Sequence, residues 1–180
     1  MKKLVLVVVA MLATGVMYAQ TYQHSVGLVV GSLNGVSYKT FVGENFAVQA
    51  DLAIGLVATQ GGSGGETGEI NYWDFQLNPN AYYQTEVAAF SWGNLAAFGG
   101  GGVSLGLSKL MGAYAASMPV MGKWGINAIA GVECSVNNLP IVFALDFRPG
   151  YGMLFYGEYG YTMTVNTFDW ALAASVRYVF

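Results

Sequence analysis

The chain ends on the stretch TFDWALAASVRYVF, residues 167–180, whose side chains alternate between two kinds of face. A period of two predicts a β-strand with one apolar and one small or polar face. A strand of about twelve residues tilted by about 40° rises roughly 28–30 Å, close to the ~25 Å apolar band of a membrane barrel. The stretch therefore predicts a membrane-spanning strand. Its apolar face carries Phe168, Trp170, Leu172, Ala174, Val176, Tyr178 and Phe180.

The same alternation recurs along most of the chain. It predicts seven further strands, of which the first two are short. Turn-forming residues separate them, including Asn34-Gly35, which is typical of a tight hairpin turn. The seven expected strands cover His24–Gly31, Val36–Val42, Phe46–Leu56, Asp74–Glu86, Leu95–Lys109, Lys123–Val136 and Ile141–Arg148.

Composition favours strands that cross a membrane over a soluble fold. Charged residues make up 9% of the chain, and aromatic residues make up 14%. Ordinary soluble domains carry about 25% charged residues. A soluble sandwich or lipocalin-like barrel needs a charged exterior that this sequence cannot supply. After the N-terminal segment, no run of 18 apolar residues occurs, so membrane helices are not expected. Apolar content without continuous apolar runs fits an all-β barrel whose eight antiparallel strands run up and down.

The N-terminus has the pattern of a secretory signal peptide. Two lysines precede an apolar run from Leu4 to Ala13, and Ala19 stands before the polar Gln20. The run is too short for a membrane helix, which needs roughly 20 residues. We therefore expect residues 1–19 to be removed and residues 20–180 to form the barrel.

The expected connections differ in length between the two ends of the barrel. Gly43–Asn45, Phe90–Asn94 and Asn137–Pro140 are short, and we assign them to the same end as both termini. The other connections include Thr59–Glu69 and Met111–Pro119, which are longer. This asymmetry is typical of outer-membrane barrels of Gram-negative bacteria, whose short turns and termini are periplasmic.

Most charged residues of the strands fall on the face opposite the apolar one. An eight-stranded barrel is just wide enough for its side chains to fill it. Opposite charges inside it are expected to pair, since an unpaired ion in a poorly solvated interior is costly. We expect a structural salt-bridge network that plugs the lumen, with a narrow polar path as the alternative. The expected network comprises Lys39, Asp51, Asp74, Glu86, Glu133, Asp146, Arg148, Asp169 and Arg177.

Motifs for other chemistry are weak. Two Gly-x-Ser-x-Gly matches, at residues 61–65 and 102–106, lack the strand–turn–helix context of a nucleophile elbow. The one histidine, His24, is expected far from Ser63, and we interpret it as an interfacial polar residue. No Cys/His cluster offers a metal site, and Cys134 is expected to face lipid. The mature chain has five basic and ten acidic residues, a net charge of −5, so nucleic acid is not expected as a partner.

The whole mature chain resembles the small eight-stranded outer-membrane barrels of the OmpA/OmpX-like class. The resemblance is carried by the closing residues Val176-Arg177-Tyr178-Val179-Phe180 and the alternation before them. It implies that Val176, Tyr178 and Phe180 form a signal read by the barrel-assembly machinery, and that outer-membrane lipid and lipopolysaccharide surround the barrel.

For function, we expect a structural or interaction protein of the outer membrane, without catalysis and without a cofactor. A pore or transporter for small or hydrophobic solutes is the main alternative. A lipid-modifying enzyme or an adhesin is a weaker one, because the sequence has a single histidine and its longest expected loop is small, polar and glycine-rich.

Overall fold

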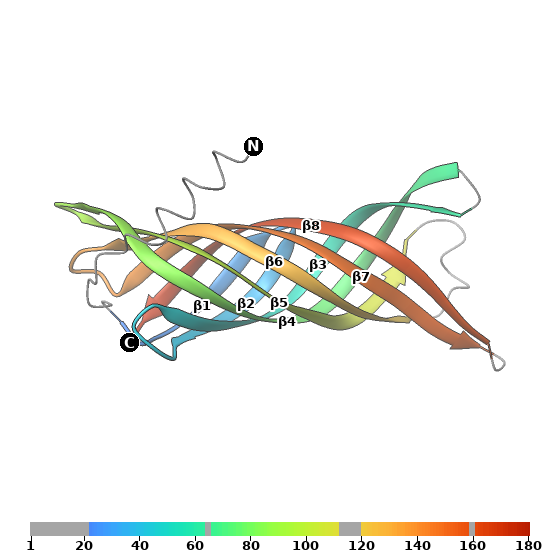
Figure 1. Ribbon diagram of the computed structural model, residues 1–180, viewed down its shortest axis with the longest axis horizontal. Coiled ribbons are helices and arrows are strands. Elements are labelled where there is room, and N and C mark those ends of the chain that lie inside the picture. Colours follow the sequence, from blue (N-terminus) through green and yellow to red (C-terminus); the bar gives the residue numbers. More distant parts are fainter. Residues whose placement is uncertain (1–21, 64–65, 112–119, 159–160) are drawn as a thin grey trace.

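Eight β-strands close into one ring (Figure 1). The computed structural model describes residues 22–63, 66–111, 120–158 and 161–180, so the expected signal peptide lies outside the described residues. No helix in these ranges is long and apolar enough to cross a bilayer. The strands are β1 (His24–Gly31), β2 (Leu33–Phe41), β3 (Phe46–Ser63), β4 (Glu66–Phe90), β5 (Gly93–Leu110), β6 (Met121–Val136), β7 (Ile141–Glu158) and β8 (Tyr161–Val179).

Each strand is antiparallel to its neighbours in sequence, and β1 pairs with β8 to complete the barrel. At this seam, the backbone of His24 donates to Phe180 over 3.0 Å, and Phe180 donates back over 2.9 Å. The start of β1 and the end of the chain therefore lie at the same end of the barrel, which we call the terminal end. The opposite end is the far end. The prediction of an eight-stranded up-and-down barrel is confirmed.

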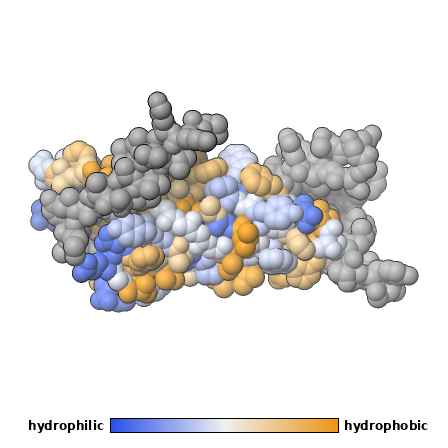
Figure 2. Space-filling view, in the orientation of Figure 1, coloured by the Kyte–Doolittle hydropathy of each residue, from blue (hydrophilic) through white to orange (hydrophobic). Residues whose placement is uncertain are grey.

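The barrel is apolar outside and polar inside. On β8, Trp170, Leu172 and Tyr178 are exposed, whereas Ser175 and Arg177 are buried. This is the alternation expected from the sequence, because successive side chains of a strand point to opposite faces. The other strands repeat it, and Figure 2 shows apolar side chains spread along the visible wall.

An apolar cluster fills part of the interior. Tyr82 and Phe98 lie with their ring centroids 4.8 Å apart. Glycines on neighbouring strands make room for them: a Cβ at Gly100 would meet the Tyr82 Cβ at 2.5 Å, and one at Gly131 would meet the Phe98 ring at 2.6 Å. The glycine-rich β5 is thus matched to bulky rings inside the barrel. The cluster comprises Phe41, Ala47, Tyr82, Phe98, Ile129 and Ala144.

Several strands extend beyond the expected bounds. The segment Thr59–Glu69 was expected to be a loop, but β3 and β4 continue to pair as far as Ser63 and Glu66. Likewise β7 and β8 pair as far as Glu158 and Tyr161. Hydrophobic alternation marks only the part of a strand that has one apolar face. Backbone hydrogen bonds can continue through polar, glycine-rich sequence in which no alternation is visible.

The expected hairpin turn at Asn34-Gly35 is wrong. Both residues lie within β2, where Gly35 pairs with Val29 of β1 and Ala53 of β3. The chain instead reverses around Ser32. Gly31 has a φ of 136°, which a residue with a side chain rarely adopts. The Asn34 amide then donates to the Gly31 carbonyl over 3.1 Å, so this asparagine closes the turn with its side chain from inside the strand.

Candidate functional site

The lumen holds the polar side chains that the barrel encloses, and the ion pairs among the described residues fall into three groups. The first lies toward the terminal end. Its centre is Glu133 on β6, whose carboxylate receives Lys39 from β2 at 2.9 Å and Arg177 from β8 at 3.1 Å. All three side chains are at most 3% exposed. Two cations from the strands that flank β1 thus converge on one buried acid of β6.

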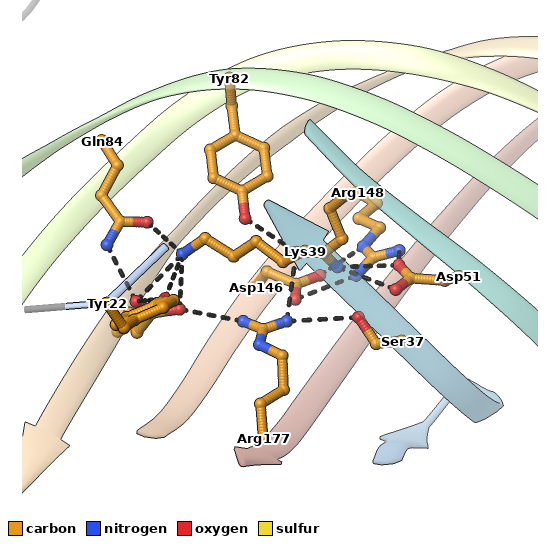
Figure 3. A network of polar contacts seen from close by, with 11 residues as sticks. Tyr22, Ser37, Lys39, Asp51, Tyr82, Gln84, Asp146, Arg148 and Arg177 are labelled. Carbon is orange, nitrogen blue, oxygen red and sulfur yellow. Dashed lines mark hydrogen bonds and ion pairs between the residues drawn. The ribbon is translucent and has the colours of Figure 1, made fainter. Parts of the chain in front are cut away.

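Neutral side chains also take part in the first ion-pair group. Lys39 also donates to Gln84 and to the Tyr22 hydroxyl, each over 2.7 Å. Tyr22 in turn donates to Glu133 over 2.6 Å. Burial, reinforced by the negative charge of Glu133, raises the pKa of the Tyr22 hydroxyl, so this group remains a proton donor. Figure 3 shows the side chains of Lys39, Gln84 and Arg177, from three strands, and of Tyr22, which precedes β1, directed toward one another.

The second group is built around Arg148 on β7. Its guanidinium contacts Asp146 of the same strand at 2.5 Å and reaches across to Asp51 on β3. Gln49 links this group to the first one, because its amide nitrogen donates to Asp51 over 2.9 Å while its oxygen accepts from Arg177 over 3.1 Å. The two groups therefore form one continuous network, which Figure 3 displays.

The third group lies nearer the far end. Lys123 on β6 contacts Asp74 on β4 and Asp169 on β8, each at 2.6 Å. Asp74 also accepts hydrogen bonds from Ser108 and Gln76. With every member ionised, the three groups hold four cations and five carboxylates, a net charge of −1.

Eight of the nine network residues expected from the sequence take part in these groups, and Glu86 does not. Glu86 is half-buried and adjoins an irregularity between Glu86 and Ala88, where the pairing of β4 with β5 shifts. Such a bulge turns the following side chains out of the regular alternation. Glu86 itself precedes the shift and still pairs in regular register with Ala96, so its alternation holds although it joins no ion-pair group.

Lys123 is the ion-paired lumen cation that the sequence interpretation missed. It shares the inward register of Asn127 and Glu133 on β6, so the period of two was enough to find it. Tyr22 and Gln84 were also missed. Tyr22 precedes β1, so the alternation within a strand could not predict that its hydroxyl contacts the lumen residues Lys39 and Glu133.

The motif at residues 61–65 lies partly outside the described residues, and the other residues considered above have ordinary surroundings. Ser104 lies within β5 and donates to the Asn127 side chain over 3.3 Å. The imidazole of His24 lies within hydrogen-bonding distance of Tyr38 and Thr40, at 3.1 and 3.0 Å. Cys134 is half-buried. Within the described ranges, no group of three or more His, Cys, Asp or Glu side chains is arranged to hold a metal ion.

Fold and lumen together define a small closed barrel with an apolar wall and an ion-paired interior. The sequence matches no protein-family model and no curated protein. Among solved structures, the chain is similar to Neisserial surface protein A, with 16% identity and a TM-score of 0.40. That alignment covers 87% of this chain and 94% of the other. The similarity concerns the fold.

Proposed function

We propose that the chain is an integral outer-membrane β-barrel of a Gram-negative bacterium, with a structural or interaction role, no catalysis and a plugged lumen. The observation that carries the proposal is the inversion of polarity. Leu28, Leu77 and Leu145 are exposed on the wall while Lys39, Asp51 and Arg177 are fully buried. In water, an apolar outer wall and a charged interior would both be unfavourable, whereas a bilayer favours this arrangement.

Aromatic side chains support the membrane setting. Trp73, Trp124 and Trp170 are exposed on strand segments toward the far end. Another exposed set lies near the terminal end. Such rings favour the boundary between hydrocarbon and water, since one part of the ring system is apolar and another polar. The second set comprises Phe46, Trp92, Tyr178 and Phe180.

The side chains that cross the lumen support the proposed plug. Lys39 and Arg177 meet on Glu133, and an apolar cluster with Tyr82 and Phe98 packs beside them. An ion moving along the axis would have to displace paired charges in a space that side chains already occupy. We therefore assign the barrel a supporting role in the envelope, surrounded by lipid and lipopolysaccharide, with the termini periplasmic.

Planar-bilayer recording tests the plug. The purified full chain is expected to give no reproducible single-channel steps. A variant with Glu133→Gln and Lys39→Met, which removes both ion pairs to Glu133 and leaves Arg177 without this acid, serves as the comparison. Regular steps from the unmodified protein would contradict the plug and favour the second candidate, a narrow pore.

Electrophoresis of detergent-solubilised protein, with and without boiling, tests the barrel itself. A closed barrel retains its compact form in mild detergent, so the two samples are expected to migrate differently. Equal migration would contradict the proposed membrane barrel.

A further inference from the structure

A cavity of about 230 Å³ lies inside the barrel between the second and third ion-pair groups. Lys123 and Asp169 line it on one side, and Arg148 lines it on the other. The register agrees: along the β6–β7 seam, Lys123 pairs with Leu154 and Asn127 with Gly150, while Arg148 lies two positions further toward the terminal end. We call this cavity the chamber.

Small residues create the chamber. Gly125 on β6 and Gly150 and Gly152 on β7 occupy inward positions where other strands carry side chains, and all three line the cavity. Ala171 on β8 is a further small residue that lines the cavity. Arg148 of the second ion-pair group lines the space toward the terminal end, and Lys123 and Asp169 of the third group line it toward the far end.

One polar group in the chamber has no partner among the described residues. Asn78 on β4 lines the cavity and is 3% exposed, and its amide nitrogen makes no hydrogen bond. A buried donor without an acceptor is costly, so this nitrogen favours a ligand that brings an acceptor. The neighbouring Asn127 is already engaged, because it donates to Asn80 and accepts from Ser104.

The charges around the chamber favour an uncharged ligand. Lys123 contacts two carboxylates, and Arg148 contacts two more. The cations at the chamber are thus already outnumbered by acids. A further anion would be repelled, and a cation would have to displace a paired lysine or arginine. A neutral acceptor such as a hydroxyl or carbonyl oxygen meets neither obstacle.

The wall beside the chamber is weakened at a proline. Pro149 on β7 has no backbone N–H, and the pairing of β6 with β7 is interrupted between Asn127–Gly150 and Ala130–Phe147. Next to this gap, the chamber touches Ile126, Tyr151 and Trp170, whose side chains are exposed on the outer wall. The chamber therefore adjoins the surface that faces hydrocarbon in the proposed setting.

We propose that the chamber binds a small uncharged amphipathic molecule that enters from the membrane through the β6–β7 seam at Pro149. Its acceptor oxygen bonds Asn78, and its short apolar chain lies along the glycine-lined wall toward Ile126, Tyr151 and Trp170. Ligand pockets usually measure about 300–1,000 Å³, so the ligand is smaller than a drug-sized molecule. The route from the membrane rests on the proposed outer-membrane function, but the polar site does not.

Quenching of Trp170 fluorescence by a brominated eight-carbon alcohol tests the site. The full barrel, in phosphatidylcholine nanodiscs, carries Trp73→Phe, Trp92→Phe and Trp124→Phe, so that Trp170 reports on the chamber. A matched protein retains Trp92 and carries Trp170→Phe instead. We expect saturable quenching of Trp170 above the linear background from probe dissolved in lipid. Trp92, at the terminal end, should give the linear background.

Three comparisons identify the contacts. Asn78→Ala is expected to weaken saturable quenching on the order of tenfold, the loss of about one hydrogen bond. Ser104→Leu fills the chamber without touching an ion pair and should abolish it. Brominated octane, which has no acceptor, and brominated octanoate, which is charged, should both bind more weakly than the alcohol in the unmodified chamber.

The proposal is overturned if Trp170 shows only linear quenching, if Asn78→Ala leaves the saturable part unchanged, or if the octanoate binds more tightly than the alcohol. Each variant is first checked for the mobility shift between unboiled and boiled samples. If Ser104→Leu fails this check, the Asn78→Ala comparison decides.

Stopped-flow quenching tests the route. Pro149→Ala restores a backbone donor at the seam and should slow association severalfold, whereas Pro140→Ala, in a turn at the terminal end, should not. Equal association rates in both variants would contradict entry at Pro149 while leaving the polar site standing. Absence of the mobility shift in the unmodified protein would instead count against the outer-membrane function.

Discussion

Glu133 is the acceptor that two buried cations share, and this makes it the most sensitive charge in the barrel. Lys39 and Arg177 both contact it, and the three side chains are almost fully enclosed. A buried ion pair is not necessarily a large source of stability, because desolvation opposes the attraction. Removing one partner is different, since it leaves an uncompensated charge behind.

Glu133→Gln keeps the shape of the side chain and removes its charge. We expect it to lower the free energy of unfolding by about 3–5 kcal/mol, because Lys39 and Arg177 would remain buried without their acid. Urea unfolding in lipid vesicles measures the change. Glu44→Gln, in an exposed turn, is the matched control and should change stability by less than about 0.5 kcal/mol. Similar effects from both variants would show that the lumen charges are solvated.

At the scale of the strand, β5 fits its neighbours only because glycine leaves backbone space. A Cβ at Gly100 would lie 2.2 Å from the Ala81 carbonyl oxygen, which belongs to the paired strand and cannot move independently. At Gly43, in a turn, a Cβ would meet nothing within 4 Å. A methyl group would therefore clash with the neighbouring backbone at Gly100 but not at Gly43.

Gly100→Ala is expected to destabilise the barrel by about 1–3 kcal/mol, the usual cost of overpacking, and Gly43→Ala is expected to change it little. Urea unfolding midpoints of the two variants, measured side by side, provide the check. If Gly100→Ala were as stable as Gly43→Ala, the close contact between β4 and β5 would be wrong.

The end of β8 has two separable roles. It closes the barrel by pairing with β1, and we propose that Val176, Tyr178 and Phe180 also form the signal for the barrel-assembly machinery. Phe180→Ala keeps the backbone bonds to His24, so refolding of purified protein in detergent should be nearly unchanged. In cells, the folded fraction in the outer membrane should fall severalfold.

Leu172→Ala, on the same face but away from the end of the strand, is the control for the assembly signal. If it lowers the folded fraction in cells as much as Phe180→Ala, the effect reflects lost apolar surface. The terminal aromatic would then have no special role in assembly.

At the scale of the whole molecule, the wall must lie in hydrocarbon if the proposed function holds. Leu28 is in the middle of β1 and is exposed on the outer face. Leu28→Arg is expected to cost about 2–4 kcal/mol, whereas Val42→Arg, in a connection at the terminal end, should cost about 0–1 kcal/mol. Unfolding in vesicles measures both. Equal costs would contradict a membrane-spanning wall.

Orientation is a second property of the whole molecule. With Cys134→Ser as background, a cysteine at exposed Met111 tests the far end, and a cysteine at Gly43 tests the terminal end. A membrane-impermeant thiol reagent added to intact cells should label Met111→Cys and spare Gly43→Cys. The reverse pattern would place the termini outside the cell.

The sequence by itself determined the strand number, the antiparallel order and the face that each strand turns inward. These follow from a local rule, because a period of two in one strand needs no knowledge of its neighbours. Eight of the nine expected lumen residues, including Asp51 and Arg148, entered ion-pair groups for the same reason. The rule did not reveal that Glu86 stays outside the ion-pair groups. Turn chemistry misplaced the first hairpin at Asn34, whose side chain closes a turn from within β2.

Only the tertiary structure decided which inward charges meet and where the lumen stays open. Glu133 contacts Lys39, 94 residues away in the chain, because the shear of the closed barrel brings β2 and β6 to one level. The chamber arises likewise from Gly125, Gly150 and Ala171 on three adjacent strands. Each is an unremarkable small residue in its own strand. Their common level depends on register around the ring, a property that no single strand encodes.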